Sequence, residues 1–118
     1  MVVLQAEELD LVDVLFIADD SDLAEMYRLK LELDGYWVRT IGLDSAVAAA
    51  RARRPDIIFL DLPAGETERL EILKVIRRAV RRPDLPAILL AGSSGAELVR
   101  AGTVLGAADF VVRVASAR

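Results

Sequence analysis

The clearest structural signal in the sequence is the run Val14-Leu15-Phe16-Ile17-Ala18, which is followed directly by Asp19-Asp20-Ser21-Asp22. The apolar run has the length of a buried strand, and the polar run is suited to capping the start of a helix. Residues 23–33 then carry apolar side chains near helical spacing, and Asp34-Gly35 is typical of a helix end. This passage therefore predicts a strand that leads into an amphipathic helix.

The same alternation continues along the chain. Strands are expected at residues 14–18, 36–41, 57–60, 87–91 and 109–112. Helices are expected at residues 23–33, 46–54, 66–82 and 96–105. Strands that alternate with helices predict an α/β, doubly wound domain with a five-stranded parallel sheet, and continuously apolar strands fit burial on both faces of such a sheet.

The two ends of the chain are unusual for this architecture. Residues 113–118 are too few for a fifth helix, so that helix is expected to be missing or truncated. Residues 1–12 are interpreted as an N-terminal extension that precedes one domain at residues 13–118. Unless the extension covers the open flank of the sheet, an exposed apolar patch predicts association, and we expect a homodimer.

Composition excludes several classes of function. The 118 residues include no cysteine and no histidine, which rules out disulfides, thiolate chemistry and imidazole acid–base chemistry. The net charge of −4 is not the footprint of a nucleic-acid-binding domain, and the paired arginines on the expected helices are interpreted as solvated faces. No apolar run is long enough to span a bilayer, and the first residues do not form a secretory signal, so we expect a cytoplasmic protein without membrane contact.

Carboxylates follow two of the expected strands. Asp19 and Asp20 end the first strand, and Asp61 ends the third. Ligands of open α/β sheets bind beyond the carboxyl ends of the strands, so these side chains are expected to converge if the strands are neighbours. Clustered carboxylates suit Mg²⁺, and a carboxylate beside such an ion can accept a phosphoryl group. The competing interpretation is that the first two cap a helix and the third only ends a strand.

The order and spacing of four blocks resemble a response-regulator receiver domain of bacterial two-component signalling, the CheY-like superfamily. The blocks are residues 14–20, 55–62, 86–92 and 105–113, and the similarity covers about residues 13–114. The resemblance implies a flavodoxin-like sheet with strand order 2-1-3-4-5. It also implies a non-enzymatic domain in phosphorelay signal transduction, without catalytic residues of its own.

The resemblance assigns roles to particular positions. Asp61 stands at the phosphoacceptor position, where a histidine kinase or phosphotransfer protein would be the donor. Mg²⁺ would be held by Asp19, Asp20, Asp61 and the backbone carbonyl of Pro63. The switch and phosphate-binding positions are Ala91, Phe110 and Arg113.

The sequence departs from the family pattern at the switch. Ala91 stands where a Ser or Thr hydroxyl is expected, Arg113 replaces a lysine, and Val114 replaces the following proline. The acidic pair has two alignments: Asp19-Asp20 is the obvious match, but a gap-free count back from Gly35 places Ala18 and Asp19 there and leaves Asp20 as a cap.

These departures leave three functional hypotheses. A degenerate, atypical receiver that acts through protein–protein interaction is favoured. The alternative is a functional response regulator that is phosphorylated on Asp61. A small phosphohydrolase of the haloacid-dehalogenase type would need a second acid two residues after the nucleophile, where Pro63 stands.

Overall fold

The expected strands form one parallel sheet in the computed structural model, which describes residues 11–63, 67–91 and 110–113. The strands are β1 (Asp13–Ile17), β2 (Trp37–Ile41), β3 (Ile57–Leu62), β4 (Ala87–Ala91) and β5 (Phe110–Arg113). The α-helices are α2 (Ser21–Leu33), α3 (Ala46–Ala52) and α4 (Glu71–Ala79), and the 3₁₀ turns are η1 (Leu43–Ser45) and η2 (Thr67–Leu70). The sheet order is β2-β1-β3-β4-β5, which confirms the predicted fold class and strand order.

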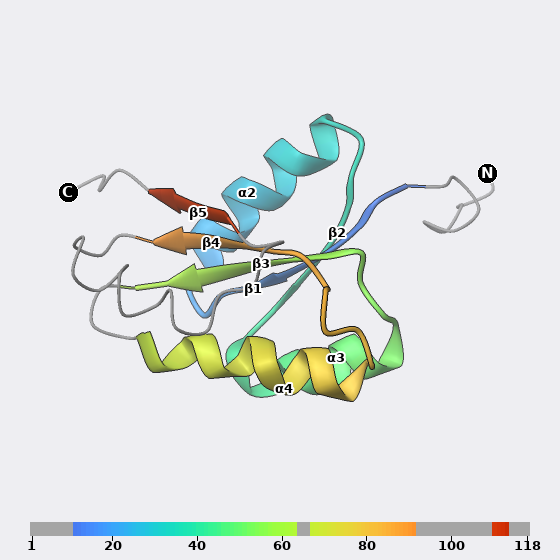
Figure 1. The fold of residues 1–118 in the computed structure, drawn as a ribbon. Coiled ribbons are helices and arrows are strands. Elements are labelled where there is room, and N and C mark those ends of the chain that lie inside the picture. Colours follow the sequence, from blue (N-terminus) through green and yellow to red (C-terminus); the bar gives the residue numbers. More distant parts are fainter. Residues whose placement is uncertain (1–10, 64–66, 92–109, 114–118) are drawn as a thin grey trace.

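The helices cover both faces of the sheet, with α2 on one side and α3 and α4 on the other (Figure 1). Each face has its own buried cluster. Leu60 and Leu62 of β3 pack with Leu73 of α4, whereas Phe16 of β1 packs on the side of α2. All five residues of β1 are buried, which explains why every residue of the strand after Asp13 is apolar.

Several predicted boundaries were wrong. Residues 66–82 do not form one helix: η2 is a separate turn, and α4 ends at Ala79. The helix predicted at 46–54 ends at Ala52, because Arg53 is already extended ahead of Pro55, whose ring disfavours helical backbone before it. The third strand continues to Leu62, so Asp61 lies inside it rather than after it. The helix predicted at 96–105, the extension up to residue 10 and residues 114–118 lie outside the described residues.

Helices α2 and α4 end in the same hydrogen-bonded turn but with different residues. After α2, Gly35 has a φ of 95°, and the N–H of Tyr36 donates to the carbonyl of Leu31 at 3.0 Å. After α4, Arg81 has a φ of 60°, and the N–H of Arg82 donates to the carbonyl of Arg77 at 2.9 Å. Both are Schellman turns, in which a left-handed residue follows the helix. Glycine adopts that backbone readily, whereas an arginine there is strained.

We expect Arg81→Gly to raise the free energy of unfolding by about 0.5–1 kcal/mol. Relief of the left-handed strain exceeds the extra freedom that glycine gives the unfolded chain. Urea unfolding followed by circular dichroism measures the change. Arg82→Gly is the matched control, and it should be neutral or destabilising because Arg82 has no positive φ to relieve.

Candidate functional site

The carboxyl ends of β1 and β3 lie side by side, so Asp19, just after β1, and Asp61, the penultimate residue of β3, belong to the same edge of the sheet. In the parallel register Ile17 of β1 is the partner of Leu60 of β3, so Asp61 lies level with Ala18. Asp61 is half-buried, and it alternates with the fully buried Leu60 and Leu62. The candidate phosphoacceptor is therefore the penultimate residue of β3, at the edge where ligands of such sheets bind.

Asp20 acts as the N-cap of α2. Its Oδ1 accepts hydrogen bonds from the backbone N–H groups of Asp22 at 3.0 Å and Leu23 at 3.1 Å. These two donors lie in the first turn, where backbone N–H groups lack partners within the helix. This arrangement agrees with the alignment that places Ala18 and Asp19 at the acidic pair and leaves Asp20 as a cap.

Asp19 is held by partners from two other parts of the chain. Its Oδ1 accepts a hydrogen bond from the N–H of Leu43 at 3.1 Å, and its Oδ2 pairs with Nη1 of Arg69 at 3.1 Å. The loop before Leu43 passes so close that a Cβ on Gly42 would lie 3.0 Å from Oδ1, a distance that favours glycine. Both carboxylate oxygens of Asp19 thus have protein partners.

Arg69 is the residue that sequence reasoning missed. It belongs to η2, which follows β3 in the chain, and it pairs with the carboxylate of Asp19, which follows β1. Its side chain is 14% exposed, whereas that of Asp19 is 53% exposed. No local pattern marks this arginine, because the contact depends on where η2 lies relative to the end of β1 in the folded sheet.

A hollow of about 320 Å³ opens beside Asp19 between the end of β1, the start of α2 and the end of β2. Its lining residues are Ala18, Asp19, Ser21, Ala24, Glu25, Thr40, Ile41 and Gly42. Hydrogen bonding to the Arg28 guanidinium lowers the pKa of the Glu25 carboxyl on this rim.

The remaining predicted site positions lie at the same edge of the sheet or near it. Pro63 directly follows β3 and is half-buried. Ala91 of β4 is the register partner of both Leu62 and Arg113, so positions 91 and 113 are neighbours at the carboxyl edge. Phe110 begins β5 opposite Ile88, toward the other end of the strand. The side chains at positions 91, 110 and 113 are outside the described part of the structure.

The carboxylate oxygens that would be metal ligands here are not arranged to fit a divalent ion. Asp19 has both oxygens engaged, and Asp20 uses Oδ1 to cap α2. Within the described ranges, no three acidic side chains form a group that could hold a metal. The carboxylates predicted as metal ligands thus belong to one edge of the sheet, but the guanidinium of Arg69 is already paired with that of Asp19.

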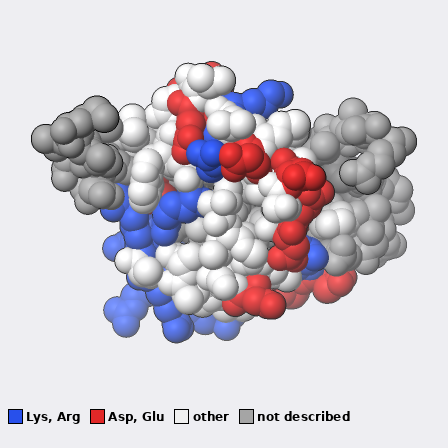
Figure 2. Space-filling model, turned by 180° about the vertical axis from the view of Figure 1, so that it is seen from behind, with Lys and Arg blue, Asp and Glu red and all other residues white. Residues whose placement is uncertain are grey.

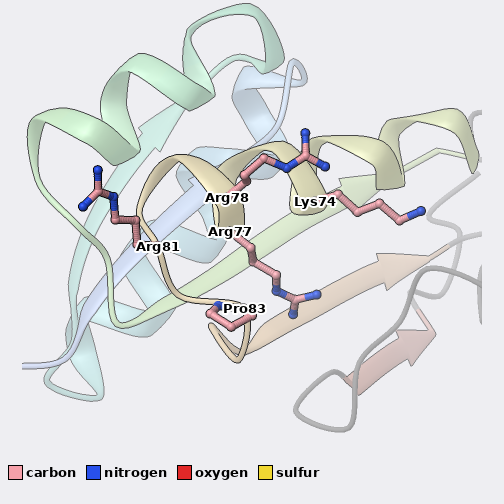
Figure 3. A pocket seen from close by; sticks show the side chains of 5 residues that line it. All are labelled: Lys74, Arg77, Arg78, Arg81 and Pro83. Atoms are coloured by element: carbon pink, nitrogen blue, oxygen red, sulfur yellow. The ribbon is translucent and has the colours of Figure 1, made fainter.

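A second hollow, of about 630 Å³, lies at the C-terminal end of α4 and is lined by Lys74, Arg77, Arg78, Arg81 and Pro83 (Figure 3). Basic side chains also gather toward the lower left of the face shown in Figure 2, while acidic side chains run down its right side. Lys74, Arg78 and Arg81 are exposed, and in Figure 3 their charged groups fan out rather than converge, which agrees with the interpretation of solvated helix faces. That interpretation is wrong for Arg77, which is buried because its Nε and Nη2 donate to the carbonyl of Leu85 at 2.9 and 2.6 Å.

Comparison with known proteins places this geometry in a family. The family model described as the response regulator receiver domain matches residues 14–117. The chain is 36% identical over 103 residues to the probable transcriptional regulatory protein TcrX of Mycobacterium tuberculosis, and 35% identical over 102 residues to the nitrogen assimilation regulatory protein NtrX of Azorhizobium caulinodans. These alignments cover 86% and 84% of this chain but 43% and 22% of the relatives, so the chain spans less than half their length.

Solved structures show the same fold. The chemotaxis protein CheY4 of Vibrio cholerae superposes with a TM-score of 0.75 at 24% identity, over 90% of this chain and 89% of that one. A response regulator from Burkholderia pseudomallei, solved with a phosphorylated aspartic acid, calcium ion and citrate, has a TM-score of 0.69 at 26% identity. That alignment covers 89% of this chain and 61% of the other.

Proposed function

The chain belongs to the response regulator receiver domain family, and we propose that it is an atypical receiver that signals through protein–protein contacts without the complete phosphorylation switch. Receiver domains are signalling modules of two-component systems and generally not enzymes, and Mg²⁺ binding is typical of the family. We propose that this chain likewise has no catalytic turnover. Its partners would be a downstream protein, or a second copy of itself, in the cytoplasm.

The observation that carries this proposal is the engagement of Asp19 by Arg69. The ion pair at 3.1 Å engages the carboxylate of Asp19, which directly follows the residue level with Asp61, and Asp20 caps a helix. Position 91 supplies a methyl group where the family pattern has a hydroxyl that would bind a phosphoryl oxygen. A receiver site without Mg²⁺ and that hydroxyl lacks two of the groups that bind phosphoryl oxygens during transfer and couple the transfer to a conformational change.

A second candidate function is phosphorylation of Asp61, and a specific observation favours it. Asp61 keeps the acceptor position on β3, half-buried at the carboxyl edge and level with Ala18 of β1. The Burkholderia pseudomallei relative was solved with a phosphorylated aspartic acid. Because this chain has no histidine, its donor would be a histidine kinase or phosphotransfer protein on another chain.

Intact-mass spectrometry after incubation with Mg²⁺ and acetyl phosphate separates the two functions. In a phosphorylatable receiver an oxygen of the Asp61 carboxylate attacks phosphorus and acetate leaves, which adds the mass of one phosphoryl group. We expect wild type to give little or no adduct. We also expect beryllofluoride with Mg²⁺ to leave the backbone amide spectrum unchanged.

Asp61→Asn is the control, because it removes the acceptor and preserves the size of the side chain. A stoichiometric adduct that is absent in Asp61→Asn, together with amide shifts in beryllofluoride, would reject the atypical-receiver hypothesis. It would support a receiver that is phosphorylated on Asp61. An adduct that persists in Asp61→Asn marks another acceptor and counts against Asp61 itself.

Output and location are also parts of this proposal. Among the described residues, no helix combines the length and apolar character that crossing a bilayer requires. The two relatives named above are transcriptional and nitrogen assimilation regulators, each more than twice the length of the matched region. We propose that this chain contributes the receiver function and does not itself contact DNA.

A further inference from the structure

We infer that the Arg69 guanidinium takes the place of the divalent ion in this site, so that Arg69 and Mg²⁺ compete for the carboxylate of Asp19. The inference rests on the proposed receiver function, because it concerns the cation of that same site. It explains how a side chain of this protein can neutralise the acidic edge.

The geometry supports a fixed cation rather than a chance surface contact. Nη1 of Arg69 lies 3.1 Å from Oδ2 of Asp19, and the N–H of Leu43 holds the other oxygen, Oδ1, at the same distance. The carboxylate is therefore oriented by two elements at once. An ordinary exposed pair between two long side chains has no such second restraint.

The backbone that carries Arg69 is anchored in the core. Leu70, the next residue, is almost fully buried and belongs to the cluster beneath α3 and α4. Turn η2 also contacts β3, the strand of Asp61. Since the Arg69 side chain is only 14% exposed, water screens its charge less than that of a surface arginine, and its position is set by packed neighbours.

Competition follows from these contacts. A divalent ion needs carboxylate oxygens as ligands, and the guanidinium beside Oδ2 of Asp19 repels a second cation that approaches the same carboxylate. Each cation then lowers the affinity of the site for the other by the same factor, as linkage requires. Removal of Arg69 should therefore raise the affinity for Mg²⁺, whereas removal of an arginine elsewhere on the acidic rim should not.

The test is a Mg²⁺ titration of the full chain at constant ionic strength, followed by the backbone amide resonance of Leu43, which reports on Asp19. We expect Arg69→Gln to bind Mg²⁺ about tenfold more tightly than wild type, within the usual range of couplings between two ligands. Asp19→Asn in the Arg69→Gln background should remove that gain, because the added affinity runs through this carboxylate.

Arg28→Gln is the matched control. Arg28 pairs with Glu25 on the rim of the same hollow and with Glu32, and its loss changes the net charge by the same amount. Equal affinities of wild type and Arg69→Gln, or an equal gain in Arg28→Gln, would overturn the inference. If circular dichroism shows that Arg69→Gln is unfolded, Arg69→Met preserves the aliphatic stem and takes its place with the same expected gain.

The titration is independent of the test of function. Acetyl phosphate and intact mass report whether Asp61 accepts a phosphoryl group, whereas the titration compares Mg²⁺ affinities without any donor present. An adduct on Asp61 together with the tenfold gain would reject the atypical reading and keep the competition. No adduct and no gain would keep the atypical reading and reject the competition.

Discussion

Asp13→Ala is expected to lower the free energy of unfolding by about 3 kcal/mol, because Asp13 is the buried anion of an ion-pair network under the amino ends of the strands. Its side chain is 5% exposed, with Nε of Arg53 at 2.7 Å from Oδ2 and Nη2 of Arg39 at 3.2 Å from Oδ1. Alanine would leave two guanidinium groups facing each other without the carboxylate between them.

The magnitude stands at the lower end of the range for breaking a buried pair, for two reasons. Arg39 keeps hydrogen bonds to the backbone carbonyls of Ala49 and Arg53, and both arginines reach water in part. Both guanidinium groups also lie over the ring of Trp37, at 5.7 Å for Arg39 and 4.6 Å for Arg53. These contacts persist in the variant and limit the loss.

Urea unfolding followed by far-ultraviolet circular dichroism measures the change as a lower midpoint at unchanged slope. Glu32→Ala is the control, because it breaks an exposed pair with Arg28 and should cost only a few tenths of a kcal/mol. Asp13→Asn should fall between the two, since it keeps the shape and one acceptor oxygen. A loss below about 1 kcal/mol for Asp13→Ala would mean that the network contributes specificity rather than stability.

This network shows where sequence reasoning stops. The strand at 14–18 was predicted from its apolar run, yet Asp13 actually begins that strand and is buried in it. A charged residue is expected outside a core unless it is paired, and its partners Arg39 and Arg53 come from β2 and from the end of α3. Only the folded sheet brings these three side chains together, so local patterns could not reveal them.

The helix ends divide in the same way. Asp34-Gly35 predicts the end of α2 correctly, because glycine is the usual left-handed residue there. The end of α4 was placed too late because Arg81 carries the same backbone conformation without the residue type that announces it. Pro83 alone bounded the segment, and a proline bounds a helix only to within a few residues.

The candidate site was predicted as far as each strand end could indicate it. Asp19 and Asp61 come to one edge because parallel strands place their carboxyl ends together, and the register of β1 and β3 follows that logic. The sequence allowed Asp20 to be either a metal ligand or a helix cap, and its contacts in the structure are those of a cap. The contact of Arg69 depends on the position of η2 beside the end of β1, which no short motif encodes.

Phe16→Ala is expected to have the largest effect of the substitutions considered, a loss of about 4 kcal/mol in the free energy of unfolding. Phe16 is fully buried on the α2 side of the sheet, with its ring centroid 5.5 Å from that of Tyr27 and 5.9 Å from that of Phe59. Its other neighbours include Ala18 and Ala24, which are too small to fill the space that a missing ring leaves.

The size of this loss depends on whether α2 can settle onto the sheet. Only a few residues join the helix to β1 at its start and to β2 at its end, so it has little freedom to move inward. Phe16→Leu retains most of the buried volume and should lose no more than about 1.5 kcal/mol, which separates the cavity from the loss of aromatic contacts. Urea midpoints for the two variants decide the matter: if Phe16→Ala loses no more than Phe16→Leu, α2 closes the cavity, and the face that it covers is less rigid than its packing indicates.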